Sequence, residues 1–253
     1  HRTDDKGLIP DILDKWFQER VEFRKLEKKY GQSGNKEKHQ YFKARQYVQK
    51  VLLNSLYGVL GLPTFRFYDS DNAEAVTLTG QSLIKYTENM GNFYYQKELG
   101  VSDDFCIYID TDSVFYSALN PSIDENNDEL MSKEILVIAK EVQDFMNSSY
   151  DMFAKKFLNV TDHRFDIKQE VIAKSGLWVA KKRYAQWIIN NNGVDCDELE
   201  VKGLDVVRSN FPPRFKKFMS GMLKDILEIK PKNDIDNNVL DFRKNLSKSN
   251  IID

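Results

Sequence analysis

The sequence predicts an α+β fold, in which helices pack against an antiparallel sheet. Three observations lead to this prediction. The first 60 residues carry the apolar spacing of helices, the middle of the chain alternates β-rich runs with turn residues, and the chain becomes polar and helical after Gly203. With 253 residues, of which 41% are hydrophobic, the chain can bury the cores of one or two compact units.

The first 60 residues predict a hairpin of two antiparallel helices. Apolar side chains recur at steps of three and four through residues 10–30, and Pro10 stands in a first turn, where a helix tolerates proline. Residues 31–35 are rich in Gly, Ser and Asn, which is typical of a turn. Residues 36–60 predict the returning helix, which ends at Gly61 and Pro63.

The elements expected after the hairpin follow from the same periodicities and turn residues. In chain order, they are a short extended segment at 64–69, a helix at 73–99 broken near Gly91, a β-hairpin at 105–117, a long helix at 129–157, strands at 164–173 and 177–189 separated by Ser175 and Gly176, and a turn at 190–193.

Charge is unevenly distributed along the chain. The net charge of −2 argues weakly against a protein that coats nucleic acid. Lys and Arg concentrate at 15–50, 181–183 and 202–217, whereas acidic residues concentrate at 103–112 and 124–134. Basic arms around an acidic centre suit a protein that holds a phosphate backbone at its edges and a metal in its middle. Each basic cluster, taken alone, equally suits a solvated helix face.

Neither a membrane segment nor a secretion signal is expected. No apolar run approaches the roughly 20 residues of a membrane span, and the N-terminal residues lack the pattern of a signal peptide. Cys106 and Cys196 are the two cysteines, which suits a reduced, intracellular compartment. Because the chain begins at His1 and stops at Asp253 within a charged, helix-like stretch, we expect it to be a segment of a longer polypeptide.

One face of the second predicted helix carries a cation, an amide and a phenol. At about 100° per residue, Lys50, Asn54 and Tyr57 fall within one stripe, opposite a row of leucines. Lysine can hold a triphosphate as a point charge, and a tyrosine ring offers a wall for a base or sugar. An ordinary amphipathic helix explains the same pattern.

Arg20 and Arg24 are four residues apart on the first predicted helix and so share a face. The antiparallel hairpin could bring this pair opposite Lys50. Three cations at one place would repel one another unless an anion were present. Alternatively, the two arginines are exposed and pair with nearby glutamates.

The segment Asp110-Thr111-Asp112 lies at the tip of the predicted β-hairpin, between apolar strands. Two crowded carboxylates require a proton or a cation between them, and oxygen ligands favour Mg²⁺. Two bridged metal ions are the usual arrangement for nucleotidyl transfer. Turns are rich in Asp, so a simple turn is the alternative, as for Asp69-Ser70-Asp71.

The run Lys181-Lys182-Arg183-Tyr184 is expected to enter a strand. Strand alternation would send Lys182 and Tyr184 to one face and Lys181 and Arg183 to the other. A long cation beside an aromatic ring suits a nucleic-acid groove. An edge strand protected by lysines is the alternative.

Together, and in this order, these motifs resemble those of family B DNA polymerases. Residues 50–58 resemble the fingers motif Lys-x-x-x-Asn-Ser-x-Tyr-Gly, residues 108–113 the palm motif Tyr-x-Asp-Thr-Asp-Ser, and residues 181–184 the Lys-Lys-Arg-Tyr motif. The resemblance covers essentially the whole chain. The short turn between the fingers helices is compatible with viral or phage members, for which the cytoplasm of a host cell would be the location.

The resemblance implies an organisation into fingers at 1–61, palm at 62–201 and a partial thumb at 202–253. It implies two Mg²⁺ ions, with Asp112 the stronger ligand and Asp110 a less direct one. Residues implied as accessory to this site are Thr111, Ser113 and Glu170.

The resemblance also implies contacts to two substrates, the deoxynucleoside triphosphate (dNTP) and primer–template DNA. Residues implied in binding the dNTP are Arg20, Arg24, Lys50, Asn54 and Tyr57, the last checking the nascent base pair. Residues implied in binding DNA are Lys181, Lys182, Arg183, Tyr184, Lys202 and Arg208.

One family motif does not occur in the 253 residues. The first catalytic motif, an Asp followed shortly by Ser-Leu-Tyr-Pro, is absent, as are the exonuclease acids. We therefore expect the isolated chain to be inactive, and its partners to include an N-terminal exonuclease and palm portion that carries this motif, and a sliding clamp. Two alternatives stay open: a non-catalytic nucleic-acid-binding remnant, and a glycosyltransferase that would require a doubly wound parallel sheet.

Overall fold

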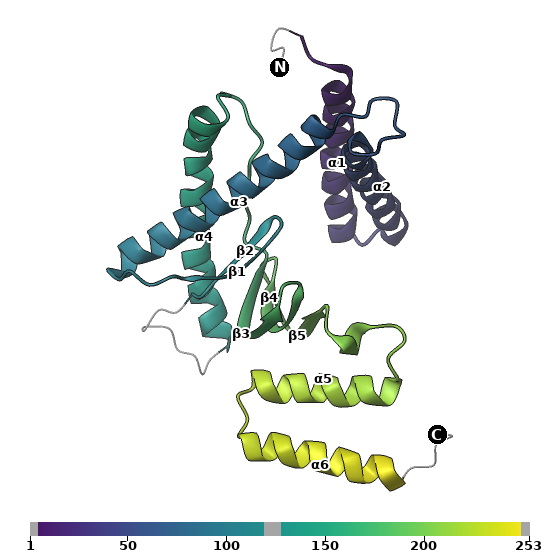
Figure 1. The fold of residues 1–253 in the computed structure, drawn as a ribbon, viewed down its shortest axis with the longest axis vertical. Helices are drawn as coiled ribbons and strands as arrows, with labels where there is room; N and C mark the ends of the chain where they lie inside the picture. The colour runs from purple at the N-terminus through teal and green to yellow at the C-terminus, as the bar shows by residue number, and fades with distance from the viewer. Residues whose placement is uncertain (1–4, 119–127, 249–253) are drawn as a thin grey trace. The chain divides into compact units, whose positions relative to one another are not determined.

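The computed structural model describes residues 5–118 and 128–248, so the acidic run predicted at 124–134 lies partly outside the described residues. The chain divides into two compact units, His1–Gly80 and Gln81–Asp253. Helices and two antiparallel sheets together make the α+β fold that the sequence predicts (Figure 1). In these two described ranges no helix combines the length and apolarity needed to cross a bilayer.

The first unit contains the predicted helical hairpin, formed by α1 (Leu8–Gln32) and α2 (Lys36–Leu60). Aromatic contacts join the helices near the turn, with Tyr30 stacked on Phe42 at a ring-centroid distance of 5.5 Å. The side chain of Asn35 accepts a hydrogen bond from the backbone N–H of Lys38 (3.1 Å), which caps the start of α2. The prediction of two antiparallel helices is confirmed.

The link after α2 differs from the extended segment predicted at 64–69. The backbone N–H of Phe65 donates to Leu62 O (2.9 Å) and that of Tyr68 to Phe65 O (3.0 Å), so this segment consists of turns and the prediction is wrong. The Asp69 carboxylate accepts from the backbone N–H of Asn72 (3.0 Å) and so caps the next helix. Asp69-Ser70-Asp71 is therefore a helix start.

Helix α3 (Ser70–Leu99) runs without interruption, so the break predicted near Gly91 is also wrong. Gly91 is buried, and a Cβ placed on it would lie 2.3 Å from the Tyr116 ring and 2.5 Å from Met146 Cε. The glycine serves close packing of the helix against its neighbours. Around it, α3 and α4 (Asp128–Phe157) share a core that contains Tyr95, Phe105 and Met146.

Replacing Gly91 with alanine is expected to destabilise the second unit by about 1–3 kcal/mol, because overpacking outweighs the roughly 1 kcal/mol that alanine gains in helix propensity. Gly221, an exposed glycine within α5 (Pro213–Leu227) with open space around it, is the matched control. Gly221→Ala is expected to stabilise by about 0.5–1 kcal/mol. Urea denaturation measures both; equal effects of the two substitutions would contradict the packing role.

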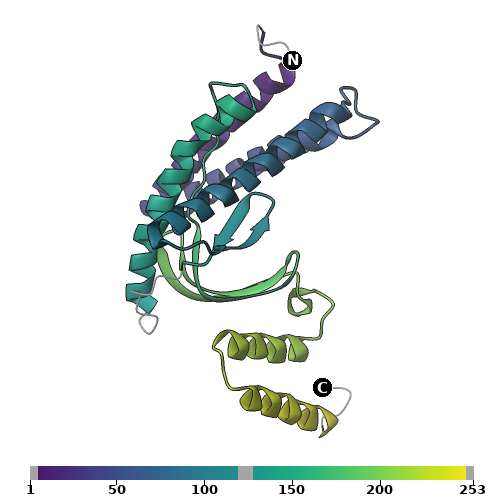
Figure 2. The same cartoon turned by 60° about the vertical axis from the view of Figure 1, so that its left-hand side comes forward.

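The strands form two sheets, and both are antiparallel. Strand β1 (Cys106–Asp110) pairs with β2 (Ser113–Tyr116), which confirms the hairpin predicted at 105–117. The second sheet has the order β3 (Val171–Ala180), β4 (Arg183–Asn191), β5 (Val194–Lys202) (Figure 1). Figure 2 shows its strands, in green, from a second direction. The antiparallel order excludes the doubly wound sheet that a glycosyltransferase would need.

The boundaries of this second sheet were only partly predicted. Residues 164–170 are not a strand, and β3 continues through Ser175 and Gly176. The turn predicted at 190–193 is confirmed, with positive φ at Asn192 (52°) and Gly193 (81°), as in a tight hairpin. Strand β5 was missed because its acidic residues hide the alternation.

Helices cover the second sheet through two apolar clusters. Met131 of α4 packs with Ile172 and Ile189, whereas Leu223 of α5 packs with Ala185. After β5 the chain forms a short 3₁₀ turn, η1 (Asp205–Val207), then α5 and α6 (Lys232–Lys248), so the helical end predicted after Gly203 is confirmed.

Candidate active site

The turn between β1 and β2 presents the paired carboxylates. Asp110 ends β1 opposite Ser113, which begins β2, and Thr111 and Asp112 form the two-residue turn between them. Backbone N–H of Asp112 donates to Asp110 O (2.6 Å), and the Ser113 hydroxyl donates to the same oxygen (3.1 Å). These bonds close the turn and keep both carboxyl groups at its tip.

The turn between β3 and β4 is formed by Lys181 and Lys182, since Ala180 pairs directly with Arg183. Lys182 has a φ of 61°, in the left-handed region. Strand alternation therefore does not apply to these lysines, and the predicted sharing of one face by Lys182 and Tyr184 is wrong: Lys182 is exposed, whereas Tyr184 is 4% exposed.

The two turns meet through an ion pair. The Lys182 ammonium donates to the Asp110 carboxylate, across 72 positions in the sequence. This hydrogen bond holds the pKa of Asp110 below its usual range, helped by the Thr111 hydroxyl, which donates to the same carboxylate (2.9 Å). An ionised carboxylate offers the oxygen ligands that Mg²⁺ takes, and a metal ion would compete with the Lys182 ammonium for Asp110.

Tyr184 lies in an aromatic cluster behind these turns, and the cluster joins the two sheets. Its ring centroid is 5.7 Å from that of Tyr108, 5.9 Å from Phe115 and 6.3 Å from Trp178. Lys202 lies over the Tyr184 ring, 5.6 Å from its centroid. Tyr184 thus supports the turns and Lys202, while its contact with primer DNA stays a prediction.

Two of the predicted DNA-contacting arginines converge on one carboxylate, that of Asp205. Asp205 forms an ion pair with Arg208, whose Nε lies 3.1 Å away, and a second with Arg183, whose guanidinium nitrogen lies 3.8 Å away. All three side chains are substantially exposed, so a phosphate could compete for either arginine. The neighbouring sequence Lys202-Gly203-Leu204-Asp205 was the available signal.

Glu170 lies apart from this group. It precedes β3, and its carbonyl oxygen accepts from the backbone N–H of Asn192 (2.6 Å) at the far end of the β3–β4 hairpin. At about 3.3 Å per residue, roughly 30 Å of strand separates it from Lys182. The structure therefore does not bring Glu170 to the Asp110 turn, and its predicted accessory role gains no support.

In the first unit, the predicted phosphate-binding side chains fall on one side of the helical hairpin. A hydrogen bond from Gln49 to the Glu19 carboxylate joins the helices. Arg20 and Lys50 each follow by one residue, and in antiparallel helices this step of about 100° turns both side chains to the same side. Arg24 and Asn54 lie about one turn further along α1 and α2, respectively. The four side chains therefore form a row along one side of the hairpin.

Arg20 is partly buried beside a second cation. Burial lowers the pKa of Arg20, and the neighbouring charge of Arg24 lowers it further. Among the described residues, the buried Arg20 Nε has no hydrogen-bond partner. Lys50 and Asn54 are exposed and Tyr57 is half-buried, so the row is open to a ligand.

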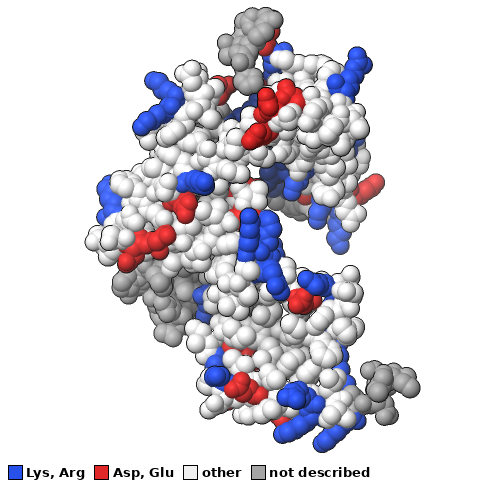
Figure 3. Space-filling model, in the orientation of Figure 1, with Lys and Arg blue, Asp and Glu red and all other residues white. Residues whose placement is uncertain are grey.

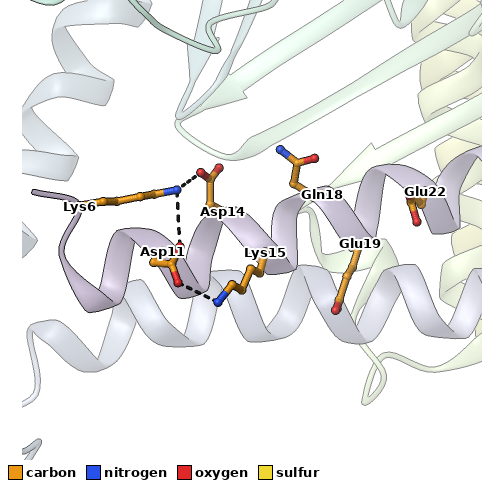
Figure 4. A pocket seen from close by; sticks show the side chains of 7 residues that line it. All are labelled: Lys6, Asp11, Asp14, Lys15, Gln18, Glu19 and Glu22. Carbon is orange, nitrogen blue, oxygen red and sulfur yellow. Dashed lines mark hydrogen bonds and ion pairs between the residues drawn. The ribbon is translucent and has the colours of Figure 1, made fainter.

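A separate depression of about 450 Å³ lies along the start of α1 (Figure 4). Lysines that line the same depression partly neutralise its acidic side chains, since Asp11 pairs with Lys15 (2.9 Å) and Lys6 (3.8 Å). The lining residues are Lys6, Asp11, Asp14, Lys15, Gln18, Glu19 and Glu22. None of them is a predicted site residue, so this depression is not the predicted site.

The described part of the chain does not hold a complete metal site by itself. Within residues 5–118 and 128–248, no group of three or more His, Cys, Asp or Glu side chains could hold a metal ion. On the face drawn in Figure 3, basic and acidic side chains are both present and are interspersed with uncharged surface.

The chain belongs to DNA polymerase family B, whose model matches residues 1–251. It is 29% identical over 196 residues to the DNA-directed DNA polymerase of Escherichia phage RB69. The alignment covers 71% of this chain and 22% of that protein. It is 29% identical over 229 residues to the DNA-directed DNA polymerase of Enterobacteria phage T4, covering 79% and 24%. A DNA polymerase of Thermococcus gorgonarius is 28% identical over 222 residues, covering 88% and 24%. The chain spans about a quarter of the length of these relatives.

Proposed function

We propose that the chain is the nucleotide- and DNA-handling segment of a DNA-directed DNA polymerase, which transfers a nucleotide from a dNTP to a primer 3′ hydroxyl. The observation that carries the proposal is the ion pair between Asp110 and Lys182, because it joins two separate polymerase motifs in one site. In this proposal, residues 1–61 are the fingers, 62–201 the palm and 202–253 part of the thumb.

Substrate binding is divided between the two units. In the first, Arg20, Arg24 and Lys50 neutralise the triphosphate, which suits the buried and unpaired Arg20 Nε, while Asn54 and Tyr57 contact the nucleotide. In the second, the exposed cations of the β3–β4 turn and of β5 bind the primer–template backbone and grooves, with an affinity that falls as salt rises.

Asp112 and Asp110 would hold Mg²⁺. The fit rests on the two carboxylates carried by one turn, and a metal ion there would replace the Lys182 ammonium at Asp110. Two Mg²⁺ ions would neutralise the phosphate charge and make the 3′ hydroxyl a stronger nucleophile. The chain's own residues bind and orient the two substrates, and an aspartate of the first catalytic motif, from a separate N-terminal portion, completes the ligand set. A sliding clamp is a further expected partner.

A non-catalytic, DNA-binding remnant is the second candidate, since the described residues offer two carboxylates where a metal site needs more. Both candidates predict DNA binding. They differ in whether primer extension is restored when the first catalytic motif is supplied.

Complementation tests the proposal. The purified 253-residue chain is expected to give no primer extension, whereas the same chain combined with the N-terminal portion that carries the first motif is expected to extend a primer in the presence of Mg²⁺. Extension of a radiolabelled primer is the measurement, with Ca²⁺ in place of Mg²⁺ as the control. Primer extension by the isolated chain would contradict the prediction that this chain lacks part of the active site. DNA binding without extension in the combined protein would favour the remnant.

A further inference from the structure

Two residues to which no role has been assigned hold the turn that carries Lys182. The first is Tyr108, whose phenol oxygen accepts a hydrogen bond from the backbone N–H of Lys182 (2.7 Å). Tyr108 lies on β1 two residues before Asp110, so both side chains project from the same face of this strand. The strand that carries the carboxylate therefore also holds the backbone of the lysine paired with it.

The second residue is Gly203, which follows β5 directly. Its φ is 68°, and a Cβ at this position would lie 2.0 Å from the Lys182 carbonyl oxygen and 3.0 Å from the Lys182 carbonyl carbon. The absence of a side chain lets the end of β5 lie against the turn. Without glycine here, the Lys182 carbonyl would have to move.

Lys182 needs such support because its φ of 61° is uncommon for a residue with a long side chain. A backbone in this region persists where its surroundings hold it. The Tyr108 phenol holds the amide side of Lys182, and the close approach of Gly203 fixes its carbonyl side. Tyr108 is itself held in the aromatic cluster, with its ring centroid 6.0 Å from Phe115 and 5.7 Å from Tyr184.

We propose that Tyr108 and Gly203 are positioning residues, which fix the left-handed turn at Lys182 so that its ammonium reaches both Asp110 and primer–template DNA. This inference rests on the proposed function for the DNA contact. Tyr108 and Gly203 act through Lys182, and in the proposal neither touches DNA or a reacting atom.

Tyr108→Phe in the 253-residue chain tests the inference, because it removes the acceptor oxygen and leaves the ring in the aromatic cluster. Loss of one hydrogen bond is expected to weaken primer–template binding about fivefold in fluorescence anisotropy. Hydrogen exchange of the Lys182 amide, followed by NMR, is expected to accelerate while exchange elsewhere in the sheet stays unchanged. Tyr94→Phe is the matched control: its phenol donates to the Glu141 carboxylate (3.0 Å) on the helical side of the same unit, and its removal is expected to leave DNA binding unchanged.

A double-mutant comparison separates positioning from a general structural effect. If Tyr108 acts through Lys182, Tyr108→Phe has no further effect on DNA affinity in a Lys182→Met background. An equal, additive loss in both backgrounds would overturn the inference. So would wild-type exchange of the Lys182 amide in Tyr108→Phe.

Gly203→Ala gives a second measurement and is expected to weaken DNA binding at least as much as Tyr108→Phe, again with no further effect in the Lys182→Met background. Should this variant fail to fold, the Tyr108→Phe comparison decides alone. If Lys182→Met leaves DNA affinity unchanged, the proposed DNA contact fails and the inference falls with it. If Lys182→Met weakens binding and Tyr108→Phe does not, the inference alone fails.

Discussion

Replacing Asp112 with alanine is expected to lower the rate of primer extension about 1,000-fold or more in the enzyme complemented with the first catalytic motif. A loss of this size corresponds to about 4 kcal/mol of transition-state stabilisation, as expected when a metal ligand is removed from an electrostatic site. Because Asp112 is exposed in the turn rather than buried in a core, the substitution is expected to leave folding intact. Single-turnover extension measures the rate, and circular dichroism checks the fold.

Asp71→Ala is the matched control, because Asp71 belongs to a second Asp-x-Asp run, Asp69-Ser70-Asp71, with the same spacing. Asp71 lies in the first turn of α3, where an acidic residue stabilises the helix end by about 0.3–1 kcal/mol. Its removal is expected to leave extension within a factor of two. Retention of extension by Asp112→Ala would eliminate Asp112 as a metal ligand and remove the main support for the catalytic reading.

Replacing Lys50 with alanine is expected to raise the KM for dNTP about 30- to 100-fold. The reason is the loss of a charge-assisted contact to the triphosphate, which contributes about 2–3 kcal/mol. Arg20 and Arg24 remain on the same side of the helical hairpin, so binding is weakened rather than abolished. Steady-state extension at varied dNTP concentration provides the measurement.

Lys25→Ala serves as the comparison for Lys50. Lys25 is exposed on α1 one residue beyond Arg24, and a step of about 100° turns it away from the row of cations. Its substitution is expected to leave the KM unchanged. A similar rise in KM for both lysines would indicate a general effect of positive charge, and no rise for Lys50→Ala would contradict the triphosphate site.

Local signals were sufficient for most of the elements. The hairpin of α1 and α2 follows from apolar periodicity and from Asn35, which caps the second helix. The turn at Asn192 and Gly193 follows from residues that tolerate positive φ. One error occurs where long-range packing decides: Gly91, predicted to break α3, is instead the place where a tyrosine ring lies against an intact helix.

In the candidate site, too, some features follow from local sequence and others depend on contacts between distant parts of the chain. The carboxylate turn at Asp110 and Asp112 was predicted from spacing alone. The position of Lys182 was not, because strand alternation does not apply to a residue in a left-handed turn. The contacts of Tyr108, Gly203 and Asp205 were not predicted, since they involve partners that are 22 to 74 positions away in the sequence or an approach that a Cβ would prevent.

The sequence by itself determined the polymerase motifs, the helical hairpin and the pairing of two carboxylates at one turn, because each depends on residues close together in the chain. Only the tertiary structure decided which cation faces Asp110 and what holds that cation in place. The physical reason is that an ion pair and a backbone approach depend on distances in space, and these are set when β1, β3, β4 and the end of β5 pack around a shared aromatic cluster.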